Sequence, residues 1–151
     1  MSSLPYARNY RELEVYKRSR ELTREIYSAT RSFPKEETYS LTDQIRRSSR
    51  SVGAQIAEAW AKRRYPKHFA SKLSDADGEQ NETQHWIEVS HDSGYISEEI
   101  QQHLLGLCIE IGRMLGSMIQ KAEGFSGDGA SHLSEEALSY LTSTPNLNTE
   151  H

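Results

Sequence analysis

Residues 41–64 read LTDQIRRSSRSVGAQIAEAWAKRR, a pattern typical of a single amphipathic helix with one narrow apolar stripe. The stripe consists of Leu41, Ile45, Ser48 or Ser49, Val52, Ile56, and Ala59 or Trp60. Ser40 is a suitable N-terminal cap, and Asp43 places a negative charge in the first turn, where the helix dipole favours it. Because several stripe residues are small, the sequence predicts a helix over about 41–63 that a neighbouring helix can approach closely.

Three further segments repeat apolar residues at helical spacing, over about 10–32, 66–91 and 97–121. Their expected caps and stops are Asn9 with Glu12, Pro34, Pro66, Gly94 and Ser97. The short connections favour antiparallel neighbours, and no strand-like alternation is sustained. The sequence therefore predicts an all-α fold, an antiparallel up-down-up-down four-helix bundle over residues 1–123.

The last of these helices carries two apolar stripes. One is a coiled-coil-like seam of Ile100, Leu104, Leu107, Ile111, Met114 and Met118. The second consists of Leu105, Ile109, Gly112, Gly116 and Ile119. A helix that is apolar on two faces must be covered on two sides. We therefore expect the first stripe to face the bundle and the second to form a subunit interface in a homo-oligomer.

Residues 124–151 have a different composition from the rest of the chain. Their first part is rich in glycine and serine, which is typical of a flexible tail, and 134–141 has the pattern of a short helix with Leu138 and Leu141. The single cysteine, Cys108, excludes an internal disulfide and a cysteine-based zinc site. With neither a secretion signal nor an apolar run long enough for a membrane span, we expect a cytoplasmic protein without membrane contact.

Charge is divided unequally along the chain, whose formal net charge is −4. Residues up to Lys72 sum to +8 and the later ones to −12. The basic candidates for a nucleic-acid-binding surface are Arg46, Arg47, Arg50, Lys62, Arg63, Arg64 and Lys67. Such a cluster can neutralise phosphates. The alternative is that these arginines pair with acids of the third helix, within or between subunits.

Catalysis is not expected. Two Glu-x-x-His units, Glu82 with His85 and Glu88 with His91, have the spacing used in carboxylate metal sites, but both lie on one helix in different registers. A solvated polar face is the simpler interpretation, and we predict no metal and no cofactor. Cys108 lies between two apolar stripes, which is typical of a buried structural thiol. A metal-dependent helical-bundle enzyme is kept as a remote alternative.

Residues 33–47, FPKEETYSLTDQIRR, resemble a pattern of the four-helix-bundle proteins encoded in intervening sequences of bacterial 23S ribosomal RNA genes. The resemblance continues through SVGAQIAEA at 51–59 and through Phe69, Leu73, Ala76, Gly78, Glu82 and Gly94-Tyr95-Ile96. It covers roughly Tyr10 to Lys121. The chain departs from the family pattern at Ser48-Ser49, where the family has an alanine pair, and at Gln55, Ala59 and Glu79.

This resemblance implies an antiparallel bundle that assembles as a homopentamer. A related branch is similar to accessory proteins of diversity-generating retroelements, which are basic and bind nucleic acid and a reverse transcriptase. We therefore expect a non-enzymatic oligomeric protein that binds RNA, DNA or a ribonucleoprotein. The alternative is a protein-directed oligomeric adaptor or scaffold that captures a protein partner through its tail.

Overall fold

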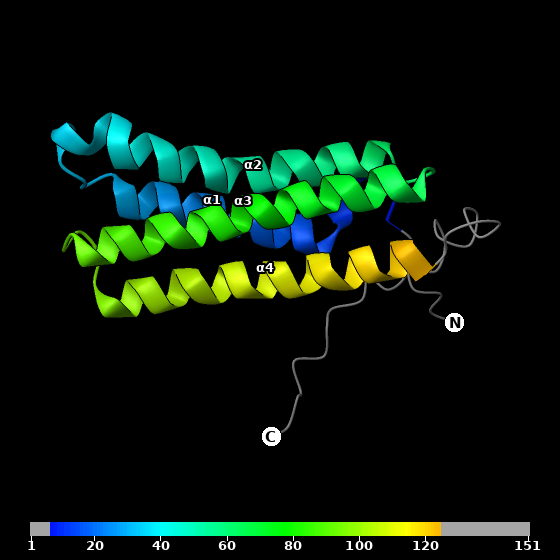
Figure 1. Ribbon diagram of the computed structural model, residues 1–151. Helices are drawn as coiled ribbons and strands as arrows, with labels where there is room; N and C mark the ends of the chain where they lie inside the picture. Colours follow the sequence, from blue (N-terminus) through cyan, green and yellow to red (C-terminus); the bar gives the residue numbers. More distant parts are fainter. Residues whose placement is uncertain (1–6, 125–151) are drawn as a thin grey trace, which may run out of the picture.

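The structure is a computed structural model that describes residues 7–124, and its helices lie side by side along one long axis (Figure 1). The helices are α1 (Glu14–Thr30), α2 (Asp43–Ala61), α3 (Pro66–Asp92) and α4 (Glu98–Gly124). Short helical turns η1 (Tyr10–Glu12), η2 (Lys35–Glu37) and η3 (Thr38–Thr42) precede α1 and α2. The expected tail, including the short helix at 134–141, lies outside the described residues.

Consecutive helices pack against each other, and α1 also packs on α4, so the four enclose one core. The α1–α2 and α3–α4 connections lie at one end of the bundle and the α2–α3 connection at the other (Figure 1). Residues 7–124 contain no strand. The predicted all-α four-helix bundle is confirmed, and the positions of the connections are consistent with the expected up-down arrangement.

The first helix begins later than the sequence pattern predicts. Asn9 caps only the short turn η1, since its Oδ1 accepts a hydrogen bond from the Arg11 amide at 2.9 Å. Glu12 does not complete a capping box, because its carboxylate accepts from the Arg8 amide at 2.6 Å. Leu13 is extended, with φ −69° and ψ 131°, and only 1% of it is exposed. Because Leu13 packs in the core with an extended backbone, the helix does not continue through this residue, and α1 starts at Glu14.

The second helix also begins later than predicted, and Ser40 does not cap it. The chain is already helical before α2, through η2 and the π-turn η3. The Asp43 amide therefore finds a partner in the Thr38 carbonyl, and no side-chain cap is needed. The Ser40 hydroxyl instead donates to the Glu37 carboxylate at 2.8 Å.

Small polar side chains let α2 approach α3 closely, as the sequence suggests. Ser48 is fully buried, and its hydroxyl accepts a hydrogen bond from the Thr83 hydroxyl at 2.9 Å. A polar pair this deep stabilises the fold only if it is satisfied, and here each hydroxyl has a partner. The Thr83 hydroxyl also lies 2.8 Å from the Glu79 carbonyl, so its single proton is shared between two acceptors.

The seam of α4 differs in part from the predicted one. The buried face follows Leu104, Leu107, Cys108, Ile111, Leu115, Met118 and Ala122. Leu115 replaces Met114, because a straight helix advances 3.6 rather than 3.5 residues per turn. The sequence pattern places Ile100 in the seam, but this residue is 43% exposed, since Ile96 fills the end of the core instead. Gly94 has φ +80°, and the Ser97 hydroxyl caps α4 through the Ile100 amide, as predicted.

Candidate nucleic-acid interface

The structure places the predicted cations in two groups rather than one. Arg46, Arg47 and Arg50 lie on α2 and are called the arginine face here. Lys62, Arg63, Arg64 and Lys67 surround the connection from α2 to α3 and are called the basic turn. Arg50 and Lys62 are twelve positions apart, which corresponds to about 18 Å along a helix axis.

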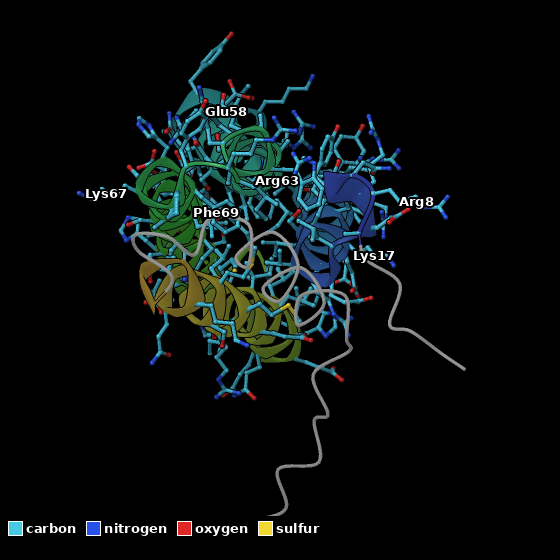
Figure 2. The ribbon with its side chains drawn as sticks, turned by 90° about the vertical axis from the view of Figure 1, so that its right-hand side faces the viewer. Arg8, Lys17, Glu58, Arg63, Lys67 and Phe69 are labelled. Carbon is cyan, nitrogen blue, oxygen red and sulfur yellow. The ribbon has the colours of Figure 1, made fainter. Side chains whose placement is uncertain are left out.

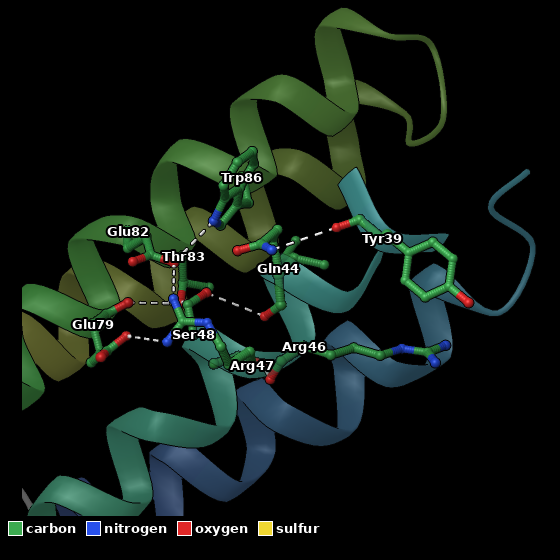
Figure 3. Close-up of polar contacts among 11 residues, drawn as sticks. Tyr39, Gln44, Arg46, Arg47, Ser48, Glu79, Glu82, Thr83 and Trp86 are labelled. Carbon is green, nitrogen blue, oxygen red and sulfur yellow. Dashed lines mark hydrogen bonds and ion pairs between the residues drawn. The ribbon is translucent and has the colours of Figure 1, made fainter. Parts of the chain in front are cut away.

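Within the arginine face, Arg46 holds two helices of the fold together. Its Nε donates to the Thr30 hydroxyl at 2.8 Å, and its guanidinium carbon lies 4.7 Å from the ring centroid of Tyr27. Both partners belong to α1, and Figure 3 shows the side chain extending from α2 across that helix. Sequence reasoning missed this contact, because nothing in the α1 pattern distinguishes Tyr27 from any other exposed tyrosine. Arg46 is therefore first a packing residue.

Arg47 pairs with the acids of α3, which is the alternative that the sequence left open, here within one chain. Its Nη2 lies 2.5 Å from Glu82 Oε2 and its Nη1 lies 3.8 Å from Glu79 Oε2. Trp86 Nε1 donates to the same Glu82 oxygen at 3.1 Å (Figure 3). The Arg47 side chain is 51% exposed, so the pair contributes only about 0–1 kcal/mol. A phosphate can replace these carboxylates at little cost in stability.

Arg50 is exposed, and no residue within 7–124 accepts a hydrogen bond from its side chain. The three arginines of this face border a shallow surface hollow of about 550 Å³, together with Asp43, Gln44, Ser51 and Ala54. The arginine face thus offers one unengaged cation, one weakly engaged cation and one that is fixed in the fold.

At the basic turn, Arg63 is the residue that shapes the connection. Its Nη1 donates to the Trp60 carbonyl at 3.0 Å, and its guanidinium carbon lies 4.4 Å from the centroid of the Trp60 ring. These contacts hold the chain after the last turn of α2. Pro66 then occupies the first turn of α3, as predicted, because its fixed φ suits a helix start.

The other members of the basic turn, Lys62, Arg64 and Lys67, are exposed, and none of them has an acidic partner within the part of the chain that the structure describes. Figure 2 looks along the bundle at this end, with Lys67 projecting outward and Arg63 closer to the centre. Arg8 lies on the opposite side of this view from Lys67 (Figure 2).

The nearest acid of α2 does not neutralise the basic turn. Glu58 lies 3.0 Å from Lys72 Nζ, and this hydrogen bond raises the pKa of Lys72. Lys72 also lies 3.8 Å from Asp75. With Glu58 already paired, the basic turn keeps its positive charge.

Of the three aromatic residues near the basic turn, only Tyr65 is accessible. Its side chain is 61% exposed and its ring lies 6.0 Å from that of His68. Phe69 and Trp60 are buried, at 2% and 8% exposure. One exposed aromatic ring can stack on one unpaired base, whereas a single-strand platform needs several.

The second stripe of α4 does not form one uniform surface. Ile109 is 44% exposed and Gly116 is exposed, with no atom within 4 Å of the place where a Cβ would lie. Leu105 and Ile119 are half-buried against the core. Gly112 faces α3 of the same chain, because a Cβ there would lie 2.8 Å from Gln80 Nε2.

The side chains that could support metal or nucleophilic chemistry are otherwise engaged. Glu82 binds Arg47, and the His85 ring packs on Trp86 at a centroid distance of 4.7 Å. Within residues 7–124, no three His, Cys, Asp or Glu side chains gather as metal ligands would. Burial raises the pKa of the Cys108 thiol to about 12, so it carries no thiolate at neutral pH. None of the described helices combines the length and the hydropathy that crossing a membrane requires.

These features define a four-helix bundle with exposed cations at the connection from α2 to α3 that have no acidic partner among the described residues. The sequence model described as 23S rRNA-intervening sequence protein matches residues 11–117, and the chain belongs to this family. A solved structure from Bacteroides thetaiotaomicron VPI-5482, a protein with unknown function from the S23 ribosomal protein family, is similar to it. The two chains are 30% identical with a TM-score of 0.62, and the similarity covers 70% of this chain and 98% of that one. A comparison with curated proteins finds no match.

Proposed function

We propose that this protein is a non-enzymatic, oligomeric nucleic-acid-binding protein that contacts RNA, or a ribonucleoprotein, through its basic turn. The observation that carries the proposal is the exposure of Lys62, Arg64 and Lys67 with no acidic partner among the described residues. Cations presented in this way release the counterions of a phosphate backbone when they bind it. The family description, which refers to 23S rRNA, makes RNA the first ligand to test.

The arginine face extends this surface. Arg50 is unengaged, and Arg47 can exchange a weak surface ion pair for a phosphate. Arg46 serves the α1–α2 contact and is not expected to reach the ligand. The proposed contact set is therefore Arg47, Arg50, Lys62, Arg64 and Lys67, with Arg63 positioning the turn.

We also propose that the chain forms a homo-oligomer, a pentamer as the family resemblance implies, through the outward side of α4. Exposed Ile109 and the open position Gly116 support this, because a second helix can approach closely there. Each added subunit contributes another basic turn, and linked binding sites raise the overall affinity far above that of one site.

The test is a binding measurement on fluorescently labelled structured RNA with two triple variants of equal charge change. K62E/R64E/K67E reverses the basic turn. R24E/R31E/K35E reverses three exposed cations elsewhere that likewise have no acidic partner among the residues described. We expect the first variant to lose binding at least tenfold more than the second. Equal losses would mean that only net charge matters, and the proposal for the basic turn would fail.

A protein-directed adaptor is the second candidate. The observation that favours it is the fit of Arg47 to Glu79 and Glu82, since it demonstrates that the arginine face can bind carboxylates. The two candidates differ in a measurable way. An adaptor binds neither RNA nor duplex DNA at low salt, and reversal of Arg50 changes its assembly or its capture of a protein partner instead.

A further inference from the structure

A groove of about 480 Å³ lies between the first turns of α3 and the last turns of α4. Its buried or half-buried walls are apolar and come from Pro66, Ala70, Ile119 and Ala122. Its exposed lining residues are polar: Lys67, Ser71 and Ser74. An apolar floor with a polar rim suits an amphipathic segment that buries two or three apolar side chains.

The described part of the chain ends beside this groove. Ala122 lines it, and α4 ends two residues later at Gly124. The following residues, 125–132, can span about 26–29 Å when extended, at ~3.3–3.6 Å per residue. The α3 wall from Pro66 to Ser74 is only about 12 Å long, at ~1.5 Å per residue. A segment that begins near residue 133 can therefore reach every part of the groove.

The sequence of this segment complements the groove. In a helical register, Leu133, Ala137, Leu138 and Leu141 fall on one stripe, and Glu135 and Glu136 flank it. Residues 125–151 contain Asp128, Glu135, Glu136 and Glu150 but no lysine or arginine. The cation at the groove rim, Lys67, has no acidic partner among the residues described, and neither do Lys62 and Arg64 just before it.

We infer that residues 133–141 dock in this groove of their own chain, with the leucines against Ala70 and Ile119 and the two glutamates facing Lys67. The inference is independent of nucleic-acid binding. Because the docked segment would place carboxylates beside the basic turn, it also gives the tail a regulatory effect on whatever anion binds there.

The test uses the full-length chain with pairs of introduced cysteines. S74C/A137C places one thiol in the groove and one on the segment, and Q120C/A137C places the first thiol at an exposed position of α4 near Gly124 that does not line the groove. Cys108 does not compete, because it is buried and its thiol stays protonated. Disulfide formation in glutathione buffer is followed by non-reducing electrophoresis and by peptide mass.

Docking predicts that S74C/A137C forms an intrachain disulfide at least tenfold faster than Q120C/A137C, since a flexible tether from Gly124 reaches both positions easily and alone gives the two pairs similar effective concentrations of about mM. Adding L138S/L141S should reduce the faster rate to that of the control, and E135K/E136K should slow it as well. Equal rates for the two pairs would overturn the inference. A disulfide between separate chains, seen when S74C and A137C single variants are mixed, would overturn the same-chain assignment.

Discussion

Replacing Gly112 with alanine is expected to destabilise the protein, although alanine is normally the better helix former. The ideal Cβ at this position would lie 2.8 Å from Gln80 Nε2, where ordinary contacts begin at 3.4 Å. Gln80 is only 4% exposed. Its amide donates to Asp77 at 2.8 Å and accepts from Gln84 at 2.7 Å, so it is not free to swing aside.

The expected change in the free energy of unfolding is the sum of opposing contributions. Alanine in place of glycine stabilises a helix interior by about 1 kcal/mol. Moving the Gln80 amide away breaks the bond to Asp77, which costs about 1 kcal/mol. Crowding in a packed interface costs a further ~1–3 kcal/mol. We expect G112A to lose about 2 kcal/mol, whereas G106A should gain up to about 1 kcal/mol, because no atom lies within 4 Å of its Cβ position.

The assay is urea unfolding followed by circular dichroism at several protein concentrations, which separates folding within the chain from subunit dissociation. The double variant Q80A/G112A supplies the control for mechanism. In the Q80A background the alanine at position 112 meets no amide, so the same substitution should become stabilising. If G112A were as stable as G106A, the close approach of α4 to Gln80 would be refuted.

Three further predictions concern the thiol, the assembly and the tail. Burial raises the pKa of Cys108 from 9.0 to about 12, so its contribution to stability is complete below pH 9 and is lost as the pH rises towards 12, by about 1.4 kcal/mol per unit. Unfolding of the wild type and C108A between pH 8 and 11 checks this, because C108A should lack that part of the slope; parallel slopes would contradict it. Ile109→Asp should lower the oligomer mass in light scattering without changing the helical content, because it places a charge on the proposed α4 interface; an unchanged mass would exclude that interface. Removal of residues 125–151 should raise RNA affinity about tenfold, or ~1.4 kcal/mol, since the tail carboxylates no longer compete for the basic turn; weaker binding would contradict this.

The sequence predicts the helices of this fold better than their beginnings. Apolar spacing identifies all four, because each must bury one stripe against its neighbours. The starts of α1 and α2 depend on packing in the core and on the preceding turns, and the spacing of apolar residues does not encode either of these. Leu13 packs in the core with an extended backbone, so α1 starts after it. The π-turn at Thr38–Thr42 makes a cap at Ser40 unnecessary.

The candidate site, too, is predicted from the sequence only in part. The basic residues are evident from the sequence, but their partners are not. Arg46 and Arg47 are equivalent in sequence, yet Arg46 packs against Tyr27 and Arg47 pairs with Glu82. These partners lie on different helices, and a difference of about 100° around α2 decides which helix each arginine meets. The unpaired cations of the basic turn can therefore be recognised only in the folded chain.

The most direct test of RNA binding by the basic turn is the salt dependence of binding to labelled structured RNA and duplex DNA. Arg50, Lys62, Arg64 and Lys67 are the cations without an acidic partner in the proposed contact set, and they predict a log–log slope of about −3.6 per subunit on duplex DNA, at ~0.9 for each phosphate neutralised. Affinity should then fall about 150-fold between ~50 and 200 mM salt, and K62E/R64E/K67E should reduce the slope to about −1. No binding of either nucleic acid at low salt, or a slope that this variant leaves unchanged, would contradict the proposed role of the basic turn.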